Sequence, residues 1–156
     1  VFAMFFLYSA SAANLGIGWG LFNSKVTSYS EVESASYLIK NMTSQDEWVL
    51  ANGMMEVGFY SERKTAELSH NYSKFLGQLR AYNATVFLTS HYEESQQLNE
   101  VAQAVQSGNG LPESTAYHLV MDSDKYQLVK VFERNVTGQD GKPATQPMVF
   151  VFKKIA

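Results

Sequence analysis

The sequence predicts a small α/β (α+β) sandwich, in which a mixed sheet of about five strands carries three flanking helices. Two observations lead to this class. Between residues 30 and 107, short apolar runs that suit buried strands alternate with segments of helical spacing. After these, β-rich runs separated by turn residues continue to the end of the chain. The alternation predicts a sheet with helices packed on it, and the closing runs predict a C-terminal antiparallel meander.

An uncharged apolar run precedes this domain, because the first charged residue is Lys25. A membrane span needs about 20 mostly apolar residues, and Trp19 and Phe22 suit the interfacial belt at its end. We therefore expect residues 1–24 to be the end of a transmembrane or buried apolar helix, in a segment of a longer protein. A helix packed against protein and a removed leader are the other interpretations. Residues 25–156 are then a soluble extracytoplasmic domain.

Three helices are expected within the domain, near residues 31–41, 70–82 and 93–107. Ser30 and Glu33 form a capping box for the first helix, since each side chain satisfies the other's free backbone donor. Each helix has an apolar face that should be buried against the sheet. These faces are Val32/Ile39, Phe75/Leu79 and Leu98/Val105.

The strands are predicted from short β-rich runs bounded by polar residues. They are Glu47–Asn52, Met55–Ser61 (a short extended element), Ala84–Ser90, Ala116–Asp122, Tyr126–Glu133 and Met148–Lys154. Ser123–Lys125 is expected to be the turn of a hairpin between the fourth and fifth runs. Residues 134–147 are expected to be a loop, because they are rich in Gly, Pro and Asn.

Composition excludes several function classes. The net charge of −3 and the scattered basic residues argue against a nucleic-acid partner. The absence of cysteine removes disulfides, thiolate metal sites and a cysteine nucleophile. Common catalytic and nucleotide-binding motifs are absent, and His70, His91 and His118 have no partner at metal-ligand spacing. We therefore predict neither a catalytic residue nor a metal or other cofactor within this segment.

Acidic residues also have structural explanations. Glu93 and Glu94 open a predicted helix, where carboxylates favour the helix dipole, and a paired-carboxylate role is the minor interpretation. Asp122 and Asp124 flank a turn, where Asp is common for backbone reasons.

The candidate ligand site is Arg63, Lys64 and Thr65. These residues follow a predicted strand and precede a predicted helix, at a sheet edge of the kind where α/β proteins bind ligands. Two basic side chains and a hydroxyl suit an anion such as phosphate. The alternative is a solvated turn in which Thr65 caps the next helix.

Four N-glycosylation sequons are present, at Asn41, Asn71, Asn83 and Asn135. All four fall at predicted ends of helices or strands, where a glycan is tolerated, so we expect exposed side chains. Asparagine also caps helices, which is the alternative explanation. The sequons favour an extracytoplasmic location.

Several segments together resemble a known family. Residues 37–41 (YLIKN), 46–51 (DEWVLA) and 59–63 (FYSER) resemble the pattern that follows the last transmembrane helix of polytopic C-type-fold glycosyltransferases, the protein-mannosyltransferase-like kin. Residues 83–90 (NATVFLTS) and 125–133 (KYQLVKVFE) are similar to later strands of the same tails. The tryptophan–aspartate signature of oligosaccharyltransferase tails is absent.

The resemblance implies a non-catalytic C-terminal domain on the extracytoplasmic side of a cell membrane. Its partners are then the membrane, its own upstream transmembrane region, a lipid-linked sugar donor and a protein or glycan acceptor. A divalent cation stays open as a cofactor of the parent enzyme only. Two alternatives from other classes remain, namely a surface or filament subunit with an apolar N-terminal helix, and a membrane-tethered ligand-binding module.

Overall fold

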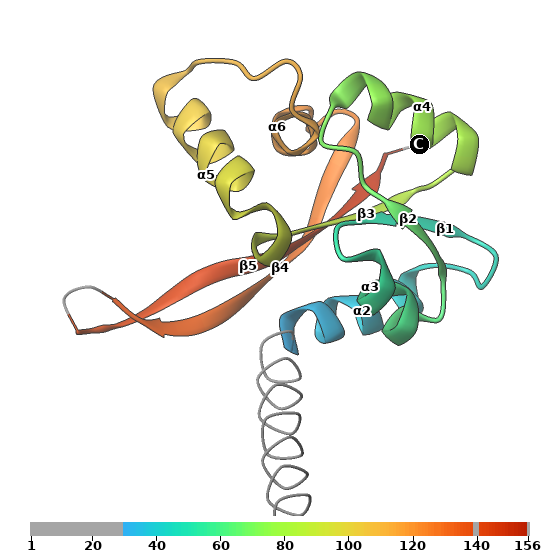
Figure 1. Ribbon diagram of the computed structural model, residues 1–156, viewed down its shortest axis with the longest axis horizontal. Coiled ribbons are helices and arrows are strands. Elements are labelled where there is room, and N and C mark those ends of the chain that lie inside the picture. Colours follow the sequence, from blue (N-terminus) through green and yellow to red (C-terminus); the bar gives the residue numbers. More distant parts are fainter. Residues whose placement is uncertain (1–29, 139–140, 156) are drawn as a thin grey trace, which may run out of the picture. The chain divides into compact units, whose positions relative to one another are not determined.

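Figure 1 shows a computed structural model of the chain, which describes residues 30–138 and 141–155. From Glu31 onward, the chain forms one compact unit. The apolar helix expected over residues 1–24 lies outside the described residues. Among the helices that are described, none combines the length and apolarity that a membrane span requires.

A mixed five-stranded open sheet forms the centre of the domain, as the sequence predicts. Its strands are β1 (Trp48–Ala51), β2 (Lys64–Glu67), β3 (Val86–Ser90), β4 (Tyr126–Thr137) and β5 (Pro143–Lys154), in the spatial order β2-β1-β3-β5-β4. The strands β2, β1 and β3 are parallel, whereas β5 runs antiparallel to both β3 and β4. The first three strands therefore end at the same edge of the sheet.

Five helices cover the sheet in the described part of the chain. They are α2 (Ser30–Met42), α3 (Met54–Ser61), α4 (Tyr72–Tyr82), α5 (His91–Ser107) and α6 (Thr115–Met121). The predicted helices correspond to α2, α4 and α5 and are confirmed, while α3 and α6 were not expected. Helices α2 and α3 lie on one face of the sheet, and α4, α5 and α6 lie on the other (Figure 1).

The prediction of an extended element at residues 55–61 is wrong, because this segment is helix α3. Strands β1 and β2 are parallel neighbours, and parallel neighbours need a crossover connection, which is usually helical. The chain reverses at Gly53, whose φ of 67° is in the left-handed region that glycine enters without strain. Within α3 only Val57 and Ser61 are buried.

The hairpin predicted around residues 123–125 is also wrong. Residues 116–122 belong mainly to helix α6, which begins where the Ser114 side chain accepts a hydrogen bond from the Tyr117 backbone N–H (3.3 Å). The C-terminal hairpin instead joins β4 to β5. Much of the predicted loop at 134–147 is strand, and it extends past the sheet as a twisted two-stranded ribbon (Figure 1).

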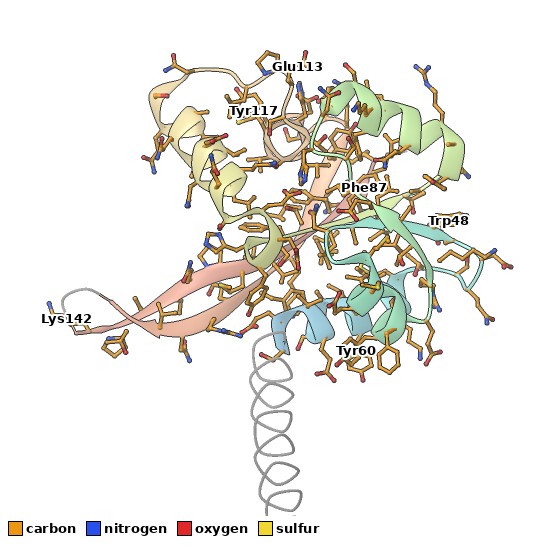
Figure 2. The ribbon with its side chains drawn as sticks, viewed as in Figure 1. Trp48, Tyr60, Phe87, Glu113, Tyr117 and Lys142 are labelled. Atoms are coloured by element: carbon orange, nitrogen blue, oxygen red, sulfur yellow. The ribbon has the colours of Figure 1, made fainter. Side chains whose placement is uncertain are left out.

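One cluster of the core lies between the sheet and the helices α4 and α6. Phe87 of β3 meets Phe75 of α4 edge to face at 5.2 Å, and it lies between the sheet and the helices (Figure 2). Of the apolar faces predicted to be buried, Val32, Ile39 and Phe75 are buried, and Leu79 and Leu98 are partly so. The prediction fails at Val105, which is 43% exposed because α5 buries Val101 and Ala104 instead.

The connections change direction at β1. The chain passes from β1 through α3 to β2 on one side, then from β2 through α4 to β3 on the other side of β1. Since parallel crossovers are right-handed, this reversal sends α3 and α4 to opposite faces. Open α/β sheets bind ligands at the carboxyl ends of strands beside such a switch point. The ends of β1 and β3 are therefore where a site is expected.

Candidate functional site

The carboxyl ends of the three parallel strands carry a cluster of polar side chains. Asn52 directly follows β1, His70 follows β2 by three residues, and Thr89 lies at the end of β3. Helix α5 starts immediately after β3 and brings Glu94 to the same edge. The sheet topology therefore gathers residues from four separate segments.

Glu94 is the centre of this cluster and is only 5% exposed. Its backbone is non-helical (φ −131°, ψ 31°), which interrupts α5 after the first turn. The carboxylate accepts hydrogen bonds from Thr89 Oγ1 at 3.0 Å and from Asn52 Nδ2, and it contacts His70 Nδ1 at 2.6 Å. Burial raises the pKa of the Glu94 carboxyl, and the neighbouring His70, Thr89 and Asn52 oppose that rise.

Asn52 is 2% exposed and is incompletely satisfied. Its Nδ2 donates to Glu94, which fixes the orientation of the amide. Its Oδ1 and Thr115 Oγ1 are the buried side-chain polar atoms without a hydrogen-bond partner in the described ranges. Thr115 is adjacent to His70, because its backbone N–H donates to the His70 carbonyl (2.9 Å). A buried acceptor of this kind is stabilised by a further hydrogen-bond donor, which an ordered water molecule supplies in many proteins.

Two adjoining clefts open beside this cluster and share His70, Gln97 and Glu100. One, of about 490 Å³, is lined by His70 and residues 93–97 and 100 of α5. The other, of about 300 Å³, extends to the loop 111–114 before α6. These volumes are at the lower end of the range of ligand sites.

The clefts are acidic. The carboxylates among their lining residues are Glu93, Glu94, Glu100 and Glu113, and neither cleft has a lysine or arginine among the described residues that line it. Carboxylates accept hydrogen bonds from hydroxyl and amine groups, and they repel phosphates. The arrangement therefore suits a hydroxyl-rich or cationic ligand. Within residues 30–138 and 141–155, no His, Asp or Glu group has the arrangement to hold a metal ion.

Arg63, the main candidate from the sequence, lies elsewhere and has another role. It follows α3 and precedes β2, so the expected strand-to-helix context is wrong. Its Nη2 donates to the backbone carbonyls of Lys40 (2.6 Å) and Thr43 (2.8 Å), and its Nε donates to Thr43 Oγ1 (3.0 Å). Its Nη1 donates to the carbonyls of Ser61 and Glu62, both at 3.3 Å.

Arg63 therefore clamps the C-terminal end of α2, where backbone carbonyls lack partners within the helix. A guanidinium has five N–H donors, and the five acceptors match them. Lys64 lies 3.5 Å from Asp46, and Thr65 Oγ1 donates to the Met54 carbonyl (2.8 Å). The structure does not bring the three side chains together around a common anion position.

The four sequon asparagines differ in their surroundings. Asn41, Asn83 and Asn135 are exposed, as expected. Asn71 is partly buried, because its Oδ1 accepts from the Lys74 N–H that starts α4 (3.1 Å) and its Nδ2 donates to Glu113 (2.7 Å). A glycan on Asn71 replaces an Nδ2 hydrogen, so glycosylation is more compatible with the other three positions.

His118 does not form a comparable site. His118 belongs to α6 and not to a strand, and its ring stacks on Tyr72 at 3.6 Å. Its Nδ1 contacts Asp122 (3.1 Å) and its Nε2 contacts the Pro112 carbonyl (3.0 Å). Both ring nitrogens are therefore used within the fold.

Comparisons with known protein families, with curated proteins and with solved structures found no match to this chain.

Proposed function

We propose that this domain binds a hydroxyl-rich ligand, such as a glycan, in the acidic clefts at the carboxyl edge of β1 and β3. The observation that carries the proposal is the lining of the two clefts, in which four carboxylates and Gln97 are present and no lysine or arginine lies among the described lining residues. We further propose that the domain serves a membrane-embedded glycosyltransferase with a lipid-linked sugar donor, as its non-catalytic extracytoplasmic part. The resemblance of residues 37–63 supports this second step.

The chemistry of the clefts supports a sugar in preference to a phosphate. Each sugar hydroxyl both donates and accepts a hydrogen bond, and carboxylates and amides supply the complementary groups. Glu100 and Gln97 line both clefts and offer these groups side by side on α5. The phosphate of a lipid-linked donor is repelled by the same carboxylates. The ligand of this site is therefore the glycan acceptor, and positioning that acceptor is the proposed role.

The resemblance implies a non-catalytic role, and the surroundings of the most buried carboxylate of the site agree with it. Glycosyl transfer needs a base within hydrogen-bond reach of the acceptor hydroxyl. Glu94 is the buried carboxylate of the site, and its two oxygens already meet His70, Asn52 and Thr89. We therefore expect the isolated chain to show no transfer when donor and acceptor are supplied together.

A matched pair of glutamines on α5 tests the binding site. Gln97 lines both clefts, whereas Gln103 is exposed on the same helix and lines neither. The 156-residue chain, held in detergent micelles, is titrated with methyl α-mannoside and followed by NMR, up to about 100 mM because small polar ligands bind in the millimolar range. Gln97→Ala should weaken binding about fivefold or more, whereas Gln103→Ala should leave it unchanged.

Equal affinities of the two variants, or an unmodified chain that does not bind the mannoside, would contradict the proposed site. Binding of lysine methyl ester but not of the mannoside would assign the clefts to an amine ligand instead. The upstream coding sequence tests the enzyme class separately. Many further hydrophobic spans with an acidic pair in the first loop would support the transferase, and a short leader would favour a tethered binding module.

A further inference from the structure

A patch of exposed apolar side chains lies on the face of the sheet that carries α2 and α3. We define the α2–α3 patch as the exposed Tyr37, Met55 and Phe59 together with Tyr60, which is half-buried between the two rings. Met55 is 78% exposed, Phe59 77% and Tyr37 48%. The rings form a continuous surface, since Tyr60 lies 5.1 Å from Phe59 and 6.2 Å from Tyr37. Contiguous exposed apolar groups of this kind mark interaction surfaces.

The patch is directed away from the core. Tyr60 projects from α3 on the side opposite to the sheet (Figure 2). Helix α3 buries only Val57 and Ser61, so Met55 and Phe59 contribute little to the core of the described fold. Helix α3 has only eight residues and an apolar outer face, so we expect an apolar partner to cover that face.

The charges beside the patch argue against an anionic partner. Lys40 on α2 pairs with Glu62 after α3 at 2.7 Å, so this pair is neutral. Glu33 and Glu56 add negative charge to the same two helices. Contact with an acidic surface is therefore not favoured, and the contact must come from the apolar and aromatic groups themselves.

The sequence before α2 indicates what covers the patch. Residues 1–24 are uncharged, and five residues, 25–29, join them to α2. Five extended residues reach at most about 18 Å, and Tyr37 lies about 10 Å along α2 from Ser30. If the run enters a bilayer, this short connection holds α2 close to the bilayer surface. Tyrosine and other amphipathic rings are enriched at that depth.

We propose that the α2–α3 patch docks on the surface of a lipid bilayer, with Met55 and Phe59 entering the interfacial layer. A few apolar side chains give only weak binding on their own, but a covalent tether raises their effective concentration at the membrane. The docking does not depend on the ligand clefts, because these lie with α5 and α6 on the other face of the sheet.

The experiment uses the absence of cysteine from the chain. Phe59→Cys and, as a matched exposed control on α5, Gln103→Cys each provide one labelling site for an environment-sensitive fluorophore. Phe59 is 77% exposed, so this replacement leaves the core intact, which circular dichroism checks. The full chain is reconstituted into phosphatidylcholine vesicles that contain a lipid-borne quencher. The label at 59 should be quenched several-fold more than the label at 103.

Adding phosphatidylglycerol to the vesicles should change the ratio of quenching at position 59 to quenching at position 103 by less than about twofold, because the patch has no basic rim. Equal quenching at the two positions would overturn the proposal. So would protection of the label at 59 without lipid, since protection that rises with protein concentration indicates a second copy. Protection without lipid that is independent of concentration would instead show that residues 1–24 themselves cover the patch.

Discussion

Two clusters of polar side chains join distant parts of this chain at opposite ends of its parallel strands. They differ in whether every polar atom has a hydrogen-bond partner. At the start of β2, the donors of Arg63 are matched by acceptors from α2 and α3. At the other end, Glu94 gathers Asn52, His70 and Thr89, but Asn52 Oδ1 has no partner. The first cluster is saturated, and the second is not.

Under the proposed function, this difference separates a structural role from a binding role. A saturated network contributes stability and has no capacity left for a ligand. An unsaturated one has an acceptor available to a further donor, either a bound water or a ligand group. The two clusters also differ in their electrostatic surroundings. The Glu94 cluster borders two acidic clefts, whereas backbone carbonyls surround the guanidinium of Arg63. The following variants test the division, beginning with the largest expected effect.

Arg63→Ala should lower the free energy of unfolding by about 3 kcal/mol, because hydrogen bonds to charged groups are lost and carbonyls at the end of α2 are left unpaired. Urea denaturation of the full chain measures the change. Arg63→Lys keeps the charge but not the planar fork, so it should recover only part of the loss.

Arg80→Ala is the matched control, since Arg80 is exposed near the end of α4. It should change the free energy of unfolding by less than about 0.5 kcal/mol. If Arg63→Ala matched this control while weakening phosphate binding, the structural interpretation of Arg63 would fail.

Glu31 forms a second hydrogen-bonded cluster with Arg134 and Tyr92. Its loss should have a smaller, pH-dependent effect on the free energy of unfolding. Glu31 accepts from Arg134 Nε (3.0 Å) and Nη2 (2.9 Å) and from the Tyr92 hydroxyl (2.6 Å). Burial raises the pKa of Glu31, but the hydrogen bonds from Arg134 and Tyr92 outweigh it and lower the pKa to about 2. The stabilisation is therefore complete above pH 4.5 and is lost as pH falls from 4.5 toward 2.

Glu31→Gln should accordingly cost about 2 kcal/mol at pH 7 and almost nothing near pH 2. Denaturant midpoints across this pH range measure the difference. Glu33→Gln, two residues along α2, serves as the control and should leave the acid limb unchanged. An unchanged acid limb in Glu31→Gln would show that the ion pair does not stabilise the fold.

Glu94→Gln should have the smallest effect on stability, with the opposite pH dependence. Because burial raises its folded pKa, the native state favours protonated Glu94, and stability falls as pH rises from about 4.5 through the folded pKa. Gln keeps the acceptor for Asn52 and removes the charge, so the variant should show a flatter profile above pH 4.5. Glu93→Gln, an exposed neighbour, should retain the original slope. A steeper slope in Glu94→Gln would contradict the assigned burial effect.

Much of the fold follows from patterns within single segments. The mixed sheet and the helices α2, α4 and α5 were predicted from periodicity, because each has a run of apolar side chains that packs on one surface. Helix α3 was missed since its segment, MEVGFYS, is short, and its outer face is as apolar as its inner one. Its helicity is imposed by the parallel pairing of β1 and β2, a contact that local composition does not encode.

The candidate site was missed for the same reason, because it too is formed by contacts between distant segments. Asn52, His70 and Glu94 are far apart in sequence, and each has an ordinary local explanation, such as the helix-start role given to Glu94. They meet only when β1, β2 and β3 are known to be parallel neighbours. The signal was present in the polar residues at the ends of the predicted strands 47–52 and 84–90 and at the start of the predicted helix 93–107. The rule that ligands bind at the carboxyl ends of strands pointed instead to Arg63, but Arg63 follows helix α3 and not a strand.

The central claim is that ligand binding belongs to the carboxyl edge and not to the Arg63 edge. NMR of the full ¹⁵N-labelled chain in micelles tests it directly, with methyl α-mannoside and inorganic phosphate added in separate titrations. We expect the mannoside to shift the side-chain amide of Asn52 and the backbone amides of His70 and Gln97, and phosphate to shift none of these. Mannoside shifts absent from this edge, or phosphate shifts centred on Arg63, Lys64 and Thr65, would contradict it.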